Sequence, residues 1–296
     1  MTDIIDSLSH ISGRYDAVFC DLWGCLHNGQ TPFPAAVAAL QAFRARGGKV
    51  VLLTNSPRPQ SSVIRQLDGL GVPHDCYDIV VSSGDAAQYA LITGAIGRRV
   101  FHLGPERDAV LFTDFSDDLR DTLTREAPIS RVPLDQAEGI VVTGLMDDRT
   151  ETPEDYHATL LFCKNNLLPM LCANPDIIVD VGDQRVYCAG AIAQAYDQMG
   201  GKSLYFGKPH PPIYDLARRR LAAICAETDP QILCIGDGIA TDVQGAVAEG
   251  LDVLFVTGGL AADQFGDDVS NPNKGLLDGW LNARELSARF AIGYLR

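Results

Sequence analysis

The chain alternates short apolar runs with amphipathic segments along most of its length. The apolar runs are rich in Val, Ile, Leu and Phe and are bounded by polar turn residues, which is typical of buried strands. The segments between them place apolar residues at helical spacing, and several end in Gly, which favours the end of a helix. The predicted strands are 16–21, 49–55, 78–83, 99–104, 139–144, 203–207, 231–237 and 251–258, and the predicted helices are 35–47, 191–201, 213–227 and 276–295.

This alternation predicts an α/β fold built on a parallel sheet, because parallel strands need helical crossovers between them. The chain has 296 residues. That length accommodates either one large domain or two smaller ones.

Polar side chains follow several of the predicted strands. Asp21 follows 17–20, Thr54 and Asn55 end the next strand, Lys208 comes just after 203–207, and Asp237 follows 232–236. Each residue also has a purely structural explanation. Asp21 could form a turn and Thr54 could cap a helix, while Lys208 could be a solvated surface charge and Asp237 could begin a turn that contains glycine. In an open α/β sheet, however, ligands bind beyond the carboxyl ends of the strands. Together these residues therefore predict one site.

Composition narrows the possible partners and the compartment. The formal net charge is −14, and no basic run or aromatic-basic cluster is present, so nucleic acid and anionic membranes are not expected partners. No apolar run reaches the roughly 18 residues that a membrane span needs, and the N-terminus lacks the pattern of a secretory signal. The eight cysteines are scattered without a CxxC pair, which predicts buried, reduced thiols in a cytoplasmic protein.

The predicted site suits phosphoryl transfer. A carboxylate at position 21 can attack phosphorus and form an aspartyl-phosphate, which divides one difficult displacement into two easier steps. Because both reactants are anionic, the attack needs cations. Asp21, Asp237 and Asp242 offer the oxygen ligands that Mg²⁺ prefers. Lys208 adds a fixed positive charge for the phosphoryl oxygens, and Thr54 and Asn55 add hydrogen-bond donors.

The ordered segments DLWG (21–24), LLTNS (52–56), FGKPH (206–210) and GDGIATD (236–242) resemble the four motifs of the haloacid-dehalogenase-like superfamily. They are most similar to its subclass IIA, which includes 4-nitrophenyl phosphatases, phosphatases of small phosphorylated metabolites and NagD-like proteins. The segment ANPD (173–176) resembles a signature near the end of that subclass's cap. The resemblance implies a Rossmann-like, doubly wound parallel-sheet core with an inserted α/β cap domain. We place the core at 1–83 and 185–296 and the cap at 84–184.

The resemblance also implies the role of each matching residue. Asp21 becomes the nucleophile and a metal ligand, and Thr54 and Lys208 bind the phosphoryl group, with Asn55 beside them. Asp237 becomes a direct Mg²⁺ ligand, Asp242 a ligand or an outer-shell group, and Trp23 a ligand through its backbone carbonyl. The implied substrate is a small phosphorylated metabolite, and a homodimer formed through the cap is possible in this subclass.

One position departs from the family pattern. Phosphatases of this family usually carry a second Asp two residues after the nucleophile, where it acts as general acid and base, but this chain has Trp23. Indole cannot serve as an acid or a base here. His27 is the tentative substitute acid, although a histidine in this loop also suits a purely structural role.

Three functional hypotheses follow from that departure. The first is a phosphatase in which another group replaces the missing Asp. The second is related chemistry of the phosphonatase or dehalogenase type, since some members of the superfamily lack that Asp. The third is a catalytically impaired protein that binds a phosphorylated ligand.

Overall fold

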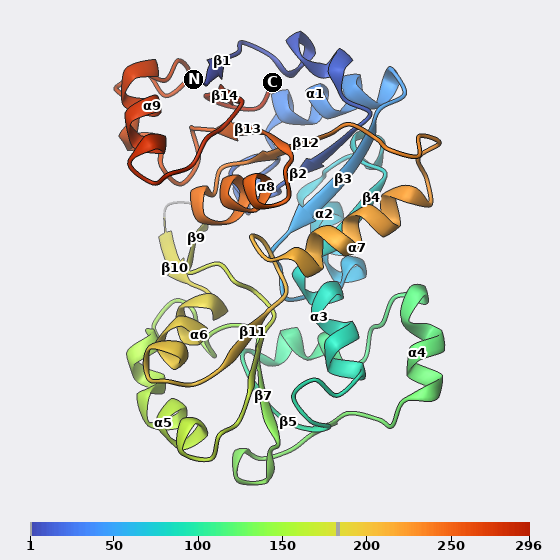
Figure 1. The fold of residues 1–296 in the computed structure, drawn as a ribbon, viewed down its shortest axis with the longest axis vertical. Coiled ribbons are helices and arrows are strands. Elements are labelled where there is room, and N and C mark those ends of the chain that lie inside the picture. Colours follow the sequence, from blue (N-terminus) through green and yellow to red (C-terminus); the bar gives the residue numbers. More distant parts are fainter. Residues whose placement is uncertain (1, 182–183) are drawn as a thin grey trace.

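The molecule has two lobes that follow one another along its long axis, and each lobe contains one sheet of parallel strands (Figure 1). The computed structural model describes residues 2–181 and 184–296. The first sheet has the order β1-β14-β13-β12-β2-β3-β4 and the second the order β11-β8-β7-β5-β6, with every pairing parallel. This architecture confirms the predicted α/β class.

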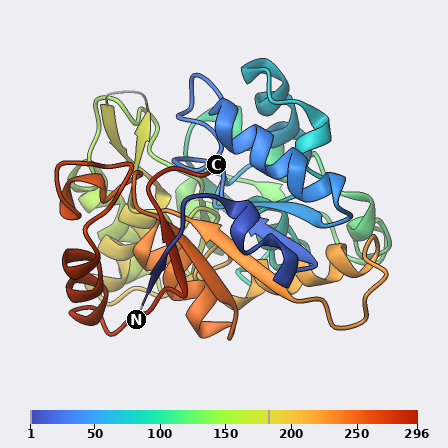
Figure 2. The same cartoon turned by 90° about the horizontal axis from the view of Figure 1, so that it is seen from above.

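The first sheet is the core sheet, and helices cover both of its faces (Figure 2). Its strands are β1 (Asp3–Ile4), β2 (Ala17–Cys20), β3 (Lys49–Thr54), β4 (Ile79–Ser82), β12 (Ile232–Gly236), β13 (Asp252–Val256) and β14 (Phe290–Ile292). Its helices are α1 (Pro34–Ala45), α2 (Gln60–Leu70), α7 (Pro211–Ala222), α8 (Gln244–Ala248) and α9 (Lys274–Asn282).

Alternate strand residues explain how the core sheet buries both faces. Val18 and Cys20 of β2 pack in one apolar cluster with α1 and α2, whereas Ala17 and Phe19 pack in the other with α7. Side chains of a strand alternate between faces. Each strand of a parallel sheet that is covered on both sides therefore has a continuous run of apolar residues in its sequence. That pattern is the basis on which these strands are predicted.

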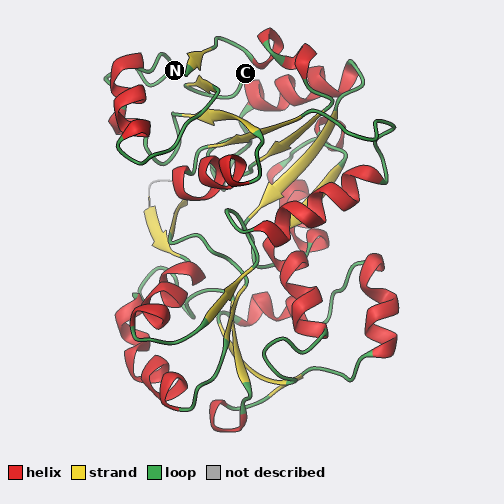
Figure 3. Cartoon of the chain, viewed as in Figure 1, coloured by secondary structure: helices red, strands yellow, loops and turns green. Residues whose placement is uncertain are grey.

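The second sheet builds the cap lobe. Its strands are β5 (Arg99–Leu103), β6 (Ser130–Arg131), β7 (Gly139–Val142), β8 (Met170–Cys172) and β11 (Ser203–Tyr205). Helices α5 (His157–Asn165) and α6 (Ala189–Gln198) pack on one face and α3 (Ser83–Ile92) on the other, while α4 (Arg120–Arg125) lies between β5 and β6 in the chain (Figure 3).

The boundary predicted at residue 184 is wrong in one respect. Helix α6 and strand β11 follow that position in the chain, yet they pack on the cap sheet and pair with β8. The cap lobe therefore continues to about residue 205. Strands of the cap sheet and of the core sheet have the same apolar pattern, so the sequence could not show which of the two sheets a strand joins.

Two further features refine the prediction. The segment 276–295 is helical only in α9, and its end forms β14, because three consecutive buried residues pair with β1 and β13. An antiparallel hairpin of β9 (Ile178–Val181) and β10 (Gln184–Tyr187) follows the cap strand β8. No helix in the described part of the chain is long and apolar enough to cross a membrane.

Candidate active site

The core sheet brings three predicted residues to one edge. Asp21 follows β2, Thr54 ends β3 and Asp237 follows β12. β2 lies between β12 and β3, and the chain order reverses between β2 and β12. Asp21 and Asp237 therefore lie at the topological switch point, where α/β sheets bind ligands.

Lys208 reaches the same edge by another route. It follows β11, a strand of the cap sheet, and precedes α7, so it lies where the chain returns from the cap to the core. Its buried Nζ atom is 2.7 Å from Oδ1 of Asp21 and 2.7 Å from Oδ1 of Asp242. One ammonium group thus bridges two carboxylates of the core.

Burial and charge compete at these groups. Burial acts to lower the pKa of Lys208, but the carboxylates of Asp21, Asp242 and Asp176 outweigh it and hold the pKa well above the usual value. Burial raises the pKa of Asp21, while Lys208 acts in the opposite direction. Lys208 therefore remains charged and favours the ionised form of Asp21, which is the form that a nucleophile requires.

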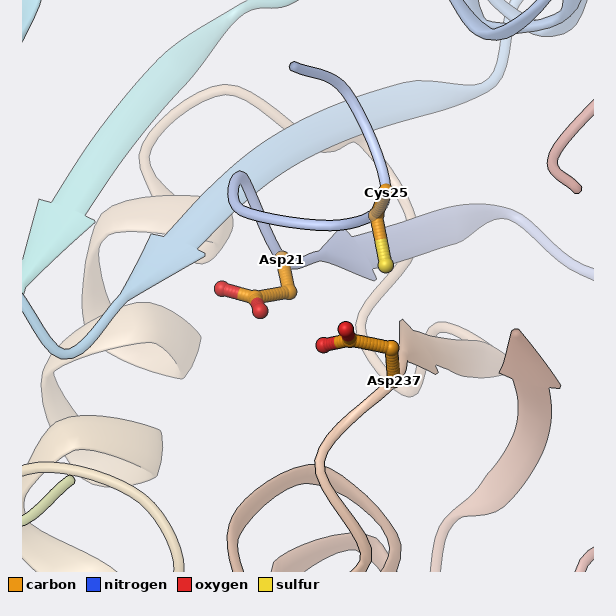
Figure 4. A group of neighbouring side chains, drawn as sticks. All are labelled: Asp21, Cys25 and Asp237. Atoms are coloured by element: carbon orange, nitrogen blue, oxygen red, sulfur yellow. The ribbon is translucent and has the colours of Figure 1, made fainter. Parts of the chain in front are cut away.

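Asp21, Cys25 and Asp237 form a tight group, with one ligand atom of each within 4.8 Å of the others (Figure 4). Burial raises the pKa of Asp237 well above its usual value, and neighbouring Asp21 and Asp242 add to that shift. Gly24 has a φ of +73°, and a Cβ there would come within 2.1 Å of an Asp237 carboxylate oxygen. Glycine at 24 therefore leaves room for that carboxylate beside Asp21.

This group fits a hard divalent cation. Two buried carboxylates facing each other repel, and a cation between them removes that repulsion. Burial raises the pKa of the Cys25 thiol well above its usual value, so Cys25 stays neutral and packs beside the oxygen donors. Asp242 lies outside the group and holds Lys208, which favours the outer-shell role over the direct-ligand role, the two alternatives predicted for it.

Thr54 and Asn55 lie at the carboxyl end of β3, but their side chains make different contacts. Thr54 is buried at the cavity, and its Oγ1 accepts a hydrogen bond from the Ser56 N–H at 3.2 Å. Asn55 accepts from the Lys208 N–H and donates to the Lys208 carbonyl and to Oδ1 of Asp176, at 2.7, 3.0 and 2.8 Å. The side-chain amide of Asn55 therefore positions its neighbours, in contrast to the phosphate contact predicted for it.

The structure argues against His27 as the acid. His27 is buried, is not among the described residues that line the cavity, and accepts a hydrogen bond from the Gly29 N–H through Nδ1 at 3.0 Å. Burial lowers its pKa to about 4, so it is neutral at pH 7. Its ring packs edge-on against Trp23, with 5.1 Å between the ring centroids. His27 therefore supports the loop that holds the Trp23 side chain at the cavity.

A cavity of about 270 Å³ connects the core site to the cap. Asp21, Trp23, Thr54 and Asn55 line its core end. The cap lobe contributes a polar wall, which includes Arg107, Asp108, Asp148 and Asp176. The hairpin of β9 and β10 contributes an apolar wall, which includes Val179, Val181 and Val186. A molecule that filled this cavity would therefore contact both lobes.

Asp176 is a residue of this cavity that the predicted site omitted. It belongs to the segment ANPD after β8, and its contact with Asn55 joins the cap to the carboxyl end of β3. The packing there is close, because a Cβ on Gly207 would come within 2.4 Å of Asn55 Oδ1 and 2.6 Å of Pro175 Cδ. The ANPD signature was the signal that could have identified Asp176.

A buried Asp beside a lysine and two further carboxylates, at the switch point of a capped parallel sheet, is the arrangement of a hydrolase of the haloacid-dehalogenase type. Residues 18–115 match the family model described as haloacid dehalogenase-like hydrolase, and residues 205–278 match a second model described as HAD-hydrolase-like. The chain belongs to the haloacid dehalogenase-like hydrolase family.

Three relatives illustrate this membership. A haloacid dehalogenase-like hydrolase from Brucella suis 1330 is 40% identical, with a TM-score of 0.85 over 99% of this chain and 100% of that one. Glycerol phosphate phosphatase from Mycobacterium tuberculosis in complex with magnesium is 25% identical, with a TM-score of 0.61 over 84% of this chain and 70% of that one. Ribonucleotide monophosphatase NagD from Escherichia coli is 24% identical over 247 residues, 83% of this chain and 88% of its own. These relatives agree with subclass IIA.

Proposed function

We propose that this protein is a Mg²⁺-dependent phosphatase that hydrolyses the monoester of a small phosphorylated metabolite through an aspartyl-phosphate at Asp21. The observation that carries the proposal is the position of Asp21, which lies 2.7 Å from Lys208, beside Asp237, and at the core end of a cavity closed by the cap. A carboxylate held in this way can attack phosphorus, and Lys208 can neutralise the phosphoryl oxygens as it does so.

Each neighbouring residue has a distinct part in this reaction. Lys208 orients Asp21 before the substrate binds, and Asp242 keeps Lys208 in place when phosphate competes for it. The Thr54 hydroxyl can donate to a phosphoryl oxygen. Asp21, Asp237 and the Trp23 carbonyl would hold Mg²⁺, which supplies charge neutralisation for the attack of one anion on another.

The relatives support a phosphatase over the other two hypotheses. The names of two of them describe enzymes that act on small phosphate monoesters, glycerol phosphate and ribonucleotide monophosphates. Dehalogenases of the superfamily need no metal, whereas this chain keeps the buried acidic group at 21 and 237. The predicted cytoplasmic location and the possible homodimer stay predictions.

A panel of phosphate monoesters tests the proposal directly. The purified protein should release inorganic phosphate from at least one small monoester when Mg²⁺ is present and lose that activity in EDTA. The Asp21→Asn variant, prepared in parallel, measures contaminating phosphatase. A parent protein no more active than this variant on every ester would contradict the proposed function.

The metal assignment predicts an effect of Asp237→Asn. Calorimetry should show Mg²⁺ binding at least about tenfold weaker than in the parent, because the variant loses a ligand carboxylate. Mg²⁺ should also raise the melting temperature of the parent but not of the variant, since a ligand that binds only the folded state stabilises it. The exposed Asp121→Asn variant, on α4, is the matched control. Equal Mg²⁺ affinity in Asp237→Asn and the parent would show that Asp237 is not a ligand.

A further inference from the structure

The proposed reaction needs a proton for the leaving oxygen, and the usual donor is absent. Trp23 occupies the position of that donor and lines the same cavity as Asp21. His27 is buried behind the Trp23 ring and cannot reach the cavity in its observed position. A phosphatase of this kind therefore needs an acid from elsewhere in the cavity wall, because an alkoxide is a poor leaving group without one.

Asp176 has the geometry of such an acid. It lines the cavity together with Asp21 and Trp23, and it comes from the cap, whereas Asp21 comes from the core. Oδ1 of Asp176 accepts a hydrogen bond from the Asn55 amide at 2.8 Å. That contact fixes the carboxyl group through one oxygen and leaves the other available to carry a proton.

The other carboxyl groups of the cavity are engaged with cations. Asp148 pairs with Arg107 at 3.0 Å, Asp108 pairs with Arg58 at 3.5 Å, and Asp21 pairs with Lys208 at 2.7 Å. Each of these carboxyl groups is therefore already held by a charged partner, whereas the carboxyl group of a general acid must be free to hand its proton to the substrate. Within residues 2–181 and 184–296, Asp176 forms no ion pair shorter than 4 Å, and its hydrogen-bond partner is a neutral amide.

We infer that Asp176 is the general acid and base of this enzyme, an inference that rests on the proposed phosphatase function. As an Asp21 oxygen forms its bond to phosphorus, the bond from phosphorus to the ester oxygen breaks, and Asp176 gives its proton to that oxygen. The alcohol leaves neutral. The Asp176 carboxylate then takes a proton from water as the water oxygen attacks the aspartyl-phosphate. The bond between the Asp21 oxygen and phosphorus breaks in this second step, so inorganic phosphate leaves and the Asp21 carboxylate and protonated Asp176 are restored.

The electrostatics of Asp176 agree with this role. Burial raises its pKa to about 6, while the Lys208 ammonium and the Asn55 amide act in the opposite direction. A carboxyl group whose pKa lies near the working pH can give and regain a proton in each cycle.

The Asp176→Asn variant separates proton donation from a structural role. The Asn side chain keeps an oxygen that can accept from Asn55, but it carries no proton to give. For alkyl phosphates, kcat/KM should fall by about 10²–10⁴-fold, which is the usual contribution of general acid catalysis. For p-nitrophenyl phosphate, whose phenolate leaves without a proton, the first turnover should be nearly unchanged. A stopped-flow burst of nitrophenolate followed by slow turnover is therefore expected, because water attack still lacks its base.

A second variant tests the role by rescue. Adding Trp23→Asp to Asp176→Asn places a carboxyl group at the usual position, and alkyl phosphate turnover should rise at least about tenfold above that of the single variant. Asp121→Asn, an exposed cap carboxylate, should match the parent on both ester classes.

The outcomes distinguish this inference from the proposed function. Unchanged alkyl phosphate activity in Asp176→Asn, or an equal loss on alkyl and aryl esters without a burst, would overturn Asp176 as the acid while the phosphatase function stands. If Asp176→Asn fails to fold, Asp176→Glu is measured instead, because it shifts the carboxyl group by one methylene. The rate on alkyl phosphates should then fall more than the rate on p-nitrophenyl phosphate. An equal effect on the two classes of ester would overturn the inference. A parent without phosphatase activity would overturn both.

Discussion

Asp21→Asn is expected to lower phosphate release by about 10⁴-fold or more on every ester, because loss of a nucleophile removes the covalent route altogether. The amide keeps the shape of the carboxylate and an oxygen that can accept from Lys208, so the fold should persist. The variant should therefore melt within a few degrees of the parent while losing turnover on aryl and alkyl phosphates alike.

Acid quenching during turnover provides an independent readout. Mass spectrometry should find one added phosphoryl group on the peptide containing Asp21 in the parent and none on the corresponding peptide of the variant. The Asp121→Asn control should carry the modification as the parent does. A variant that keeps more than about one hundredth of the parental rate, or a phosphoryl group on another residue, would show that Asp21 is not the nucleophile.

Lys208→Met should impair both stability and activity. Lys208 Nζ lies 2.7 Å from carboxylates of Asp21 and Asp242, and all three groups are largely buried. Removing one partner of a buried ion pair typically costs about 3–5 kcal/mol, since the remaining charge is uncompensated. Activity should fall by about 10²–10³-fold, comparable with the loss of one fixed donor to developing charge.

The stability loss should depend on pH in a defined direction. Lys208 now acts to lower the pKa of Asp21 and of Asp242, and burial acts to raise both. Without Lys208, the folded-state pKa of each carboxyl group rises further above its unfolded value. Such groups destabilise the fold when ionised, so the deficit should be largest at pH 7 and should shrink as pH falls and they become protonated.

Urea unfolding of Lys208→Met and the parent, measured without Mg²⁺ at pH 7 and pH 5.5, tests this dependence. The exposed Lys202→Met variant, which lies just before β11, is the matched control and should follow the parent at both pH values. A deficit that is absent at pH 7, or that grows as pH falls, would contradict the assigned role of Lys208.

The convergence of the core residues was accessible from the sequence for a geometric reason. Parallel strands end at the same edge of a sheet, so polar residues after the runs 17–20, 49–54 and 232–236 had to lie near one another once those runs were assigned as strands. The approach of Lys208 was anticipated, but for a reason that the structure corrects, since its preceding strand belongs to the cap sheet.

The general acid, in contrast, could not be identified from the sequence. The sequence established that Trp23 cannot act as an acid, yet it offered His27 as a substitute only because His27 is close in the chain. Burial decides against His27, and burial depends on the packing of Trp23 and the loop around Gly29. Asp176 lies 155 residues from Asp21 in the sequence. It reaches the cavity only because the cap packs against Asn55, the residue after β3.

Apolar periodicity and short motifs are local properties of the chain, and they were enough to predict the α/β class, the family, the candidate nucleophile and the carboxylates of the switch point. The end of the cap, the partners of the charged groups and the groups that stay neutral became clear only from the three-dimensional packing. Those properties depend on burial and on distances between segments far apart in the chain, and residue order does not record them.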